Sequence, residues 1–458
     1  MTEAKDDLRD RLARLTPEQR RTLARRLPCS GPDETPPALP LSPAQFGIWL
    51  FEQLNPGSTA YHNPAALRLR GHLDKRAVHG ALRFMAGRHQ ALRSRVVEDD
   101  EAMPVYVPMA GDSVDYTESR AATADEGALL RAVTASARRP FDLERGPLWR
   151  SELVRAAPDD HVLVVTFHHV ISDGWTLGIF LREFFTVYED IRGGLPPRLA
   201  RPRYTHADAV RAVRTASPSR ERSLAHWKAA LAGAPPAVAL PGLRHAGADS
   251  RGGSIVFTLD AATTAGLRVA ARSRGVSEFS AATAVFLGWL GRHCRQDDVV
   301  VTTVVADRRA PQTQEAVGCF LNTLPLRVRL PADGDWDALL RRTGAAVTEA
   351  LDHADVPFAQ IAAAVGESSR GEAAISNVMV LHANAGPDRL EAAGLSMSRL
   401  RIPLIASKHQ LGLLITPGDD TITCELEYQT GAFSREQAEA AVRGIRVCAA
   451  EAARSPAL

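Results

Sequence analysis

Residues 161–176 read HVLVVTFHHVISDGWT, and this stretch decides how the rest of the chain is interpreted. Residues 161–167 are apolar and mostly β-branched, which predicts a buried strand that ends where the two histidines begin. Asp173 and Gly174 then predict a turn. The periodic apolar residues of TLGIFLREFFTVYEDI, at 176–191, predict a helix behind that turn.

The two histidines at the end of this strand suit acid–base chemistry. A neutral imidazole accepts a proton near neutral pH, so a histidine that faces a cleft can act as a general base. We expect Asp173 to support the loop through an ion pair with a distant arginine, and Gly174 to permit a sharp turn. A histidine pair at a strand end can equally be structural, so the stretch alone leaves both interpretations open.

The composition excludes several classes of protein. A length of 458 residues predicts two domains of about 200 residues each. A net charge of +2 gives no overall field that would attract nucleic acid or anionic lipid. The five cysteines show no CxxC spacing, which argues against a zinc site and a disulfide framework. The charged N-terminus and the lack of any run of 18 apolar residues predict a cytoplasmic protein, neither exported nor membrane-spanning.

The chain divides into three parts by its patterning. Residues 1–40 combine two short predicted helices with a Pro-rich linker, PCSGPDETPPALP, and form a possible docking element. We expect an N-terminal lobe at 41–215, which carries the histidine pair. A C-terminal lobe at 216–458 repeats the mixture of strands and helices in a similar order.

Six segments in order identify a family. FHHVISDGWT resembles the core motif of the condensation domains of nonribosomal peptide synthetases. Further motifs of the family are matched in sequence order by LSPAQFGIWLFEQLNPGSTAYHNP at 41–64, GRHQALRS at 87–94, RYTHADAV at 203–210, VGCFLNTLPLR at 317–327 and HADVPFAQI at 353–361. The resemblance covers residues 41–450, nearly the whole predicted folded chain.

The resemblance implies a fold and a set of site residues. The fold is α+β, with two lobes like chloramphenicol acetyltransferase in a V-shaped pseudo-dimer and the active site in a tunnel between them. His169 is then the catalytic residue, His168 and Asp173 shape the loop, and Asp173 pairs with Arg308. The Gly174 amide faces the reacting thioester. Candidates for lining the substrate space are Trp175, for which core packing is the alternative, and Cys319, Asn322, Ser376 and His409.

The resemblance also implies a reaction and its partners. We expect an amide or ester bond to form when an acyl group passes from the phosphopantetheine thioester of a donor carrier protein to an amine or hydroxyl. The acceptor is either held on a second carrier protein or free. We expect no cofactor and no metal in this chain, and no nucleotide-binding fingerprint is visible. Because the chain opens with Met and stops where the match stops, we expect a free-standing enzyme or an excised terminal domain.

Two kinds of alternative remain. The first is an enzyme of the same superfamily, either an acyltransferase that uses coenzyme A or an epimerisation domain. VGCFLNT and AYHNP favour condensation over epimerisation. The second is a non-catalytic domain that keeps the fold and recruits a carrier protein or an oxygenase; the intact second histidine and Gly174 argue against it.

Overall fold

The computed structural model describes residues 38–112, 114–213, 218–235, 237–242, 251–306, 308, 311–366, 375–383 and 389–455. The two predicted N-terminal helices and nearly all of the Pro-rich linker lie outside the described residues, so the docking element stays a prediction. The end of the predicted linker is different, because Leu39–Pro40 form strand β1. This strand pairs antiparallel with β4, at Pro104–Pro108.

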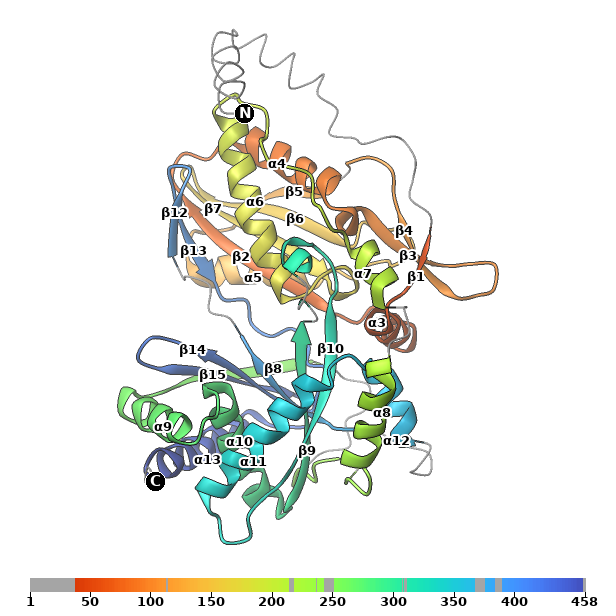
Figure 1. The fold of residues 1–458 in the computed structure, drawn as a ribbon. Coiled ribbons are helices and arrows are strands. Elements are labelled where there is room, and N and C mark those ends of the chain that lie inside the picture. Colours follow the sequence, from red (N-terminus) through yellow and green to blue (C-terminus); the bar gives the residue numbers. More distant parts are fainter. Residues whose placement is uncertain are drawn as a thin grey trace, which may run out of the picture.

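The N-terminal lobe is built on a six-stranded sheet of order β12-β13-β2-β7-β6-β5 (Figure 1). The predicted strand is β7, Asp160–His168, and it lies between β2 and β6. Alternate β7 side chains enter two different apolar clusters, one on each face of the sheet, which explains why its sequence is apolar throughout. The other strands of this sheet are β2 (His62–Arg70), β5 (Asp115–Arg120), β6 (Trp149–Ala157), β12 (Arg389–Ala392) and β13 (Leu395–Leu400).

Helices cover both faces of this sheet. The predicted helix after the turn is α6, Gly174–Arg192, and it packs beside α4, Lys75–Arg88, on one face. Helix α5, Glu126–Ala137, covers the other face. The lobe also contains α3 (Pro43–Leu54), α7 (His206–Val213), β3 (Ser94–Glu98) and the short helices η1 (Gln90–Arg93) and η2 (His169–Ile171).

The C-terminal lobe has a second six-stranded sheet, of order β10-β9-β11-β14-β15-β8. Its helices cover one face and enclose the largest apolar cluster, in which α10 is buried along almost its whole length. The opposite face is turned toward the N-terminal lobe (Figure 1). The strands are β8 (Gly252–Leu259), β9 (Asp298–Ala306), β10 (Leu321–Arg329), β11 (Val378–His382), β14 (Leu411–Pro417) and β15 (Ile422–Gln429). The helices are α8 (Pro218–Ala230), α9 (Ala261–Ser273), α10 (Glu278–Cys294), η3 (Pro311–Glu315), α11 (Trp336–Asp352), α12 (Phe358–Gly366) and α13 (Arg435–Ala453).

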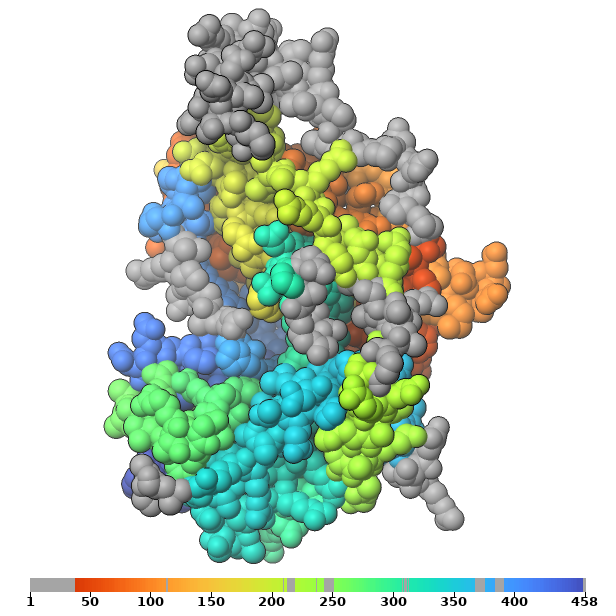
Figure 2. Space-filling view, viewed as in Figure 1, coloured from red at the N-terminus to blue at the C-terminus, as the bar shows by residue number. Residues whose placement is uncertain are grey.

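Two segments of the C-terminal half belong structurally to the N-terminal lobe. Strands β12 and β13 extend the N-terminal sheet, because β13 pairs antiparallel with β2. Figure 2 shows their blue atoms on the flank of that lobe. Val317 and Cys319, just before β10, enter the apolar cluster of the N-terminal lobe. The predicted boundary between residues 215 and 216 therefore separates most strands of the two sheets. It does not separate β12 and β13, which follow it in sequence but belong to the N-terminal sheet.

Candidate active site

The loop that carries the histidine pair is held by the chain on both sides. Strand β7 ends at His168, η2 begins at His169, and α6 begins at Gly174. The side-chain amide of Gln45 on α3 donates to the Val170 carbonyl at 2.7 Å. The amide of His169 donates to the Tyr61 carbonyl at 2.8 Å. These bonds fix the backbone of the loop before any catalytic side chain is considered.

Hydrogen bonds give the two histidines different tautomers. His169 Nδ1 lies 3.1 Å from the Ser172 carbonyl, which only accepts, so Nδ1 carries the proton and Nε2 keeps a lone pair. His168 Nδ1 accepts the Val170 amide at 3.2 Å, so its proton is on Nε2. The neutral form of His169 therefore presents a basic nitrogen, whereas the equivalent lone pair of His168 is used by its own loop.

His168 has a structural environment. Its side chain is buried, and its Nε2 lies 3.5 Å from Oε1 of Glu52 on α3. Burial lowers the pKa of His168, and the Glu52 carboxylate opposes that shift. The predicted role of His168 in shaping the loop is supported by these contacts. Glu52 was not singled out from the sequence, because the helical pattern does not show that the one charged residue of α3 turns inward.

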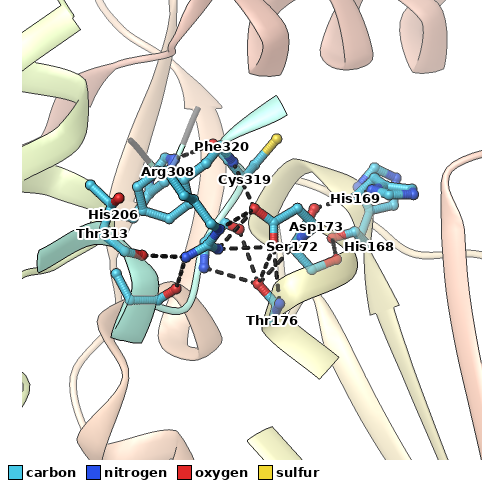
Figure 3. Close-up of polar contacts among 12 residues, drawn as sticks. His168, His169, Ser172, Asp173, Thr176, His206, Arg308, Thr313, Cys319 and Phe320 are labelled. Atoms are coloured by element: carbon cyan, nitrogen blue, oxygen red, sulfur yellow. Dashed lines mark hydrogen bonds and ion pairs between the residues drawn. The ribbon is translucent and has the colours of Figure 1, made fainter. Parts of the chain in front are cut away.

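Asp173 and Arg308 form a buried bidentate ion pair, with Nε–Oδ2 at 3.0 Å, Nη2–Oδ1 at 2.9 Å and Nη2–Oδ2 at 2.8 Å (Figure 3). Their side chains are 0% and 2% exposed. Asp173 also caps α6, where its Oδ1 accepts the Thr176 amide at 2.9 Å. Arg308 donates further to the carbonyls of Thr313 and Ala316. Every part of both charged groups is thus satisfied, as a buried pair requires.

Thr176 and Gly318 make a second contact between the two halves of the chain. The Thr176 hydroxyl lies 3.0 Å from the Gly318 carbonyl and accepts the Gly318 amide at 3.2 Å. A Cβ at Gly318 would stand 2.6 Å from Cδ2 of His206, so only glycine allows this approach. His206 is itself held by the Cys319 carbonyl at 3.0 Å. The glycine of VGCFLNT was the available sequence signal for this contact; Thr176 and His206 lie in motif segments, but nothing in the sequence linked them to it.

The electrostatic surroundings keep His169 uncharged. Burial lowers its pKa well below the ordinary value, and the nearby ammonium of Lys408 lowers it further. The ring of Tyr61 meets that of His169 edge-on, with centroids 6.2 Å apart. Burial raises the pKa of Tyr61 to about 12, so its phenol stays protonated. A neutral imidazole with an available Nε2 can take a proton from an attacking nucleophile.

Two sequence-based interpretations differ from the structure: that a sharp turn requires Gly174, and that Trp175 packs in the core. That the Gly174 amide faces the thioester stays a prediction. Gly174 does not have a positive φ; it is the first residue of α6, so the turn does not need glycine. A Cβ at Gly174 would meet no heavy atom within 4 Å. The absence of a side chain therefore leaves the backbone of the first turn of α6 open to approach at this point. Trp175 does not pack in the core, because its side chain is 42% exposed. Its ring lies 5.9 Å from the guanidinium carbon of Arg308.

The other candidate lining residues are placed as follows. Cys319 is buried, and burial with the Asp173 charge raises the pKa of its thiol to about 12, so it is not a nucleophile. The Asn322 amide binds the Ala354 and Val356 carbonyls, and the Ser376 hydroxyl binds backbone of β9 and β11. These bonds give Asn322 and Ser376 structural roles. His409 follows Lys408, and burial lowers its pKa to about 4. That these residues line the substrate space stays a prediction.

Comparisons with known proteins identify the family of the chain. A family model of the condensation domain matches residues 37–458. Chondramide synthase of Chondromyces crocatus is 33% identical over 404 residues, which cover 86% of this chain and 10% of that protein. The chain therefore spans about a tenth of that relative's length.

Solved structures agree in fold. The X-domain in its complex with OxyB from teicoplanin biosynthesis matches with a TM-score of 0.81 and 25% identity, covering 94% of this chain and 96% of that one. The starter condensation domain of rhizomide synthetase, in complex with C8-CoA, matches with a TM-score of 0.78 and 21% identity, covering 92% and 96%. These likenesses confirm the predicted two-lobed α+β fold of the chloramphenicol acetyltransferase type. In the described part of the chain, no helix is long and apolar enough to cross a bilayer.

Condensation domains are acyltransferases that form amide bonds from thioesters, and the loop, the ion pair and the family match together show that this chain is a condensation domain of the nonribosomal peptide synthetase family.

Proposed function

We propose that this domain transfers an acyl group from a phosphopantetheine thioester, carried by a donor carrier protein, to a nucleophile that His169 deprotonates. The observation that carries the proposal is the orientation of His169. Its Nδ1 is tied to the Ser172 carbonyl, its backbone is held at Tyr61, and its Nε2 is left as the proton acceptor. The site lies where segments of both halves of the chain meet, as a tunnel entered from two sides would require.

The step balances without any further reagent. The nucleophile attacks the thioester carbonyl, and its proton passes to Nε2 of His169. The tetrahedral intermediate collapses, the C–S bond breaks, and the phosphopantetheine thiolate leaves and takes up the proton. A thioester is already activated, and an α-amine with a pKa near 8 is partly neutral at pH 7, so positioning supplies much of the acceleration for amines. A neutral hydroxyl is a much weaker nucleophile than a neutral amine. Transfer to a hydroxyl therefore depends more on the base.

An apolar stripe on α3 offers a landing surface for a carrier protein. Phe46, Leu50 and Leu54 follow one another at helical spacing and are 37%, 43% and 73% exposed. The same helix contacts η2, the short helix that begins at His169. A carrier bound there would stand close to the site, within reach of a flexible arm such as phosphopantetheine. Carrier proteins as donor and acceptor partners are part of this proposal.

The test is intact-mass spectrometry of a loaded carrier protein. The wild type, His169→Ala and the control His72→Ala are each incubated with matched amine and alcohol acceptors; His72 is exposed in the turn after β2, at the opposite end of that strand from the site. We expect His169→Ala to slow transfer to the alcohol about 100- to 10,000-fold and to the amine less, while His72→Ala changes neither. Equal losses on both acceptors would contradict a base role.

Two alternatives are decided by the same experiment. The rhizomide starter domain was solved with C8-CoA, which favours testing octanoyl-coenzyme A as the donor beside the octanoyl carrier. Transfer from coenzyme A with an efficiency equal to transfer from the carrier would make the domain a coenzyme A-dependent acyltransferase. The X-domain match comes from a complex with OxyB, which favours a recruitment role. A loaded carrier that binds but never loses its acyl group with any acceptor would support recruitment.

A further inference from the structure

Lys408 places an ammonium group beside the catalytic histidine. It lies in the segment that leads into β14, and its Nζ stands 4.5 Å from the centroid of the Tyr61 ring. The same Tyr61 ring meets the His169 ring edge-on. One aromatic ring is thus in contact with both groups, which places Lys408 in the immediate surroundings of the reacting atoms.

This ammonium has no anion to pair with. Among the described residues, no carboxylate lies within 4.0 Å of Nζ, and no hydrogen bond from it is made. Glu427 on β15 is the carboxyl group whose charge acts on it from further away. Lys408 is half-buried, and its ammonium contacts the Tyr61 ring but no anion, so a negatively charged ligand would complete its surroundings.

The pKa values agree with an open pair rather than a closed one. Burial lowers the pKa of Lys408 to about 8, and burial with the neighbouring charge of Glu425 raises the pKa of Glu427 to about 7. A contacting ion pair would shift both pKa values the other way, because each charge would stabilise its partner. Lys408 and Glu427 are therefore a cation and a carboxyl group that do not satisfy each other.

We propose that Lys408 binds the carboxylate of the acyl acceptor, so that this domain selects a free amino acid or another amine that carries a carboxylate. The inference rests on the function proposed above. A donor on phosphopantetheine has its carboxyl group in the thioester, and an acceptor tethered in the same way has none left either. An α-carboxylate beside His169 therefore belongs to a free acceptor.

The acceptor then reacts from a fixed position. The acceptor reacts in its amine form, after its ammonium has given one proton to solvent. With its carboxylate on Lys408, the amine attacks the thioester carbon and passes a second proton to Nε2 of His169. The new C–N bond forms, the C–S bond breaks, and the departing thiolate takes the proton from His169. The product is an N-acyl amino acid with a free carboxylate, and the carrier is left with its thiol.

The experiment compares Lys408→Met and Lys408→Arg with the wild type on one acyl-loaded carrier. The acceptors are glycine and alanine, their carboxamides, and alanyl-N-acetylcysteamine as a mimic of a tethered acceptor. We expect Lys408→Met to reduce kcat/KM for the free amino acids about 10- to 100-fold, mainly through KM, and for the carboxamides and the thioester less than about 3-fold. Lys408→Arg should retain part of the preference.

Two controls isolate the carboxylate. Dividing each variant rate by the wild-type rate for the same acceptor removes the different basicity of the amines. Lys228→Met changes an exposed lysine on α8 and should leave every acceptor unaffected. Thermal denaturation of Lys408→Met shows whether the variant is folded, and a folded variant makes the ratio interpretable.

Several results would overturn the inference. If Lys408→Met slows amino acids and carboxamides by the same factor, Lys408 does not recognise the carboxylate. If it selectively slows transfer from a succinyl carrier but not from a butyryl carrier, the anion belongs to the donor and our assignment is wrong. Turnover by the wild type with unchanged selectivity in Lys408→Met would refute this inference alone. If the wild type transfers no acyl group to any acceptor, the proposed function on which this inference rests is refuted.

Discussion

Two pairs of opposite charges lie where the lobes meet, and they differ in one respect. Asp173 and Arg308 touch through three contacts of 2.8–3.0 Å, whereas Lys408 and Glu427 do not come within 4.0 Å of each other. The first pair is closed because both charged groups are saturated by the chain. The second pair is open, because its members do not satisfy each other, and this difference underlies the carboxylate site proposed for Lys408. The Asp173–Arg308 pair therefore has a structural role, whereas Lys408 can bind a charged ligand.

The largest effect should come from breaking the closed pair. Arg308→Met leaves the Asp173 carboxylate buried without its partner, and also removes the donor to the Thr313 and Ala316 carbonyls. We expect the free energy of unfolding to fall by about 3–5 kcal/mol in urea denaturation followed by circular dichroism.

A surface pair provides the control for that measurement. Arg435 and Glu439 are paired on α13 at 3.0 Å, but their side chains are 74% and 45% exposed. Arg435→Met should change the unfolding free energy by less than about 0.5 kcal/mol. If Arg308→Met costs no more than this control, the pair does not hold the lobes together and the comparison fails.

Acid should destabilise the protein through its buried histidines. Burial lowers the pKa of His62 and of His206 to about 4, below the unfolded value of about 6.5. Each therefore takes up a proton in the unfolded chain first as the pH falls through 6.5, so its contribution to stability is present above pH 6.5 and is lost between pH 6.5 and 4. Glu427, with a raised pKa, acts in the opposite direction between pH 7 and 4.5.

The net expectation is a loss of about 1–3 kcal/mol in unfolding free energy between pH 7.5 and pH 5.0, measured by urea denaturation at each pH. His62→Gln should reduce this difference, because it removes one group that titrates only on unfolding. An unfolding free energy that stays constant over this range in both the wild type and His62→Gln would contradict this expectation.

The sequence predicted the parts of the site that lie close together in the chain. The strand, the histidine pair and the following helix were all read from residues 161–191, because a strand period and a helical period are local. The Asp173–Arg308 pair was reached only through family resemblance, since 135 residues separate the two partners. Nothing local indicates which of many arginines a buried aspartate will meet.

The remaining features depend on tertiary packing and could not be read from a pattern. Strands β12 and β13 join the sheet of the other lobe, and nothing in their sequence indicates that β13 pairs with β2. Glu52, the single charged residue of α3, and Lys408, in the segment before β14, turn toward the site, and no local pattern indicates this. The tautomers of His168 and His169 follow from backbone groups that are placed only when the loop is folded.

The smallest expected change in unfolding free energy is that of Lys408→Met, and it distinguishes the Lys408–Glu427 pair from the Asp173–Arg308 pair. Lys408→Met replaces a half-buried ammonium that contacts no carboxylate with an apolar chain of similar length, which removes a desolvation cost and the contact with the Tyr61 ring but no hydrogen bond. We expect the unfolding free energy to change by less than about 1 kcal/mol in either direction, against the loss of several kcal/mol for Arg308→Met. Both variants are measured in the same urea series at pH 7.5. A loss for Lys408→Met as large as that for Arg308→Met would mean that Lys408 and Glu427 close into contact in solution; the ammonium would then be structural, and no charge would remain for an acceptor's carboxylate.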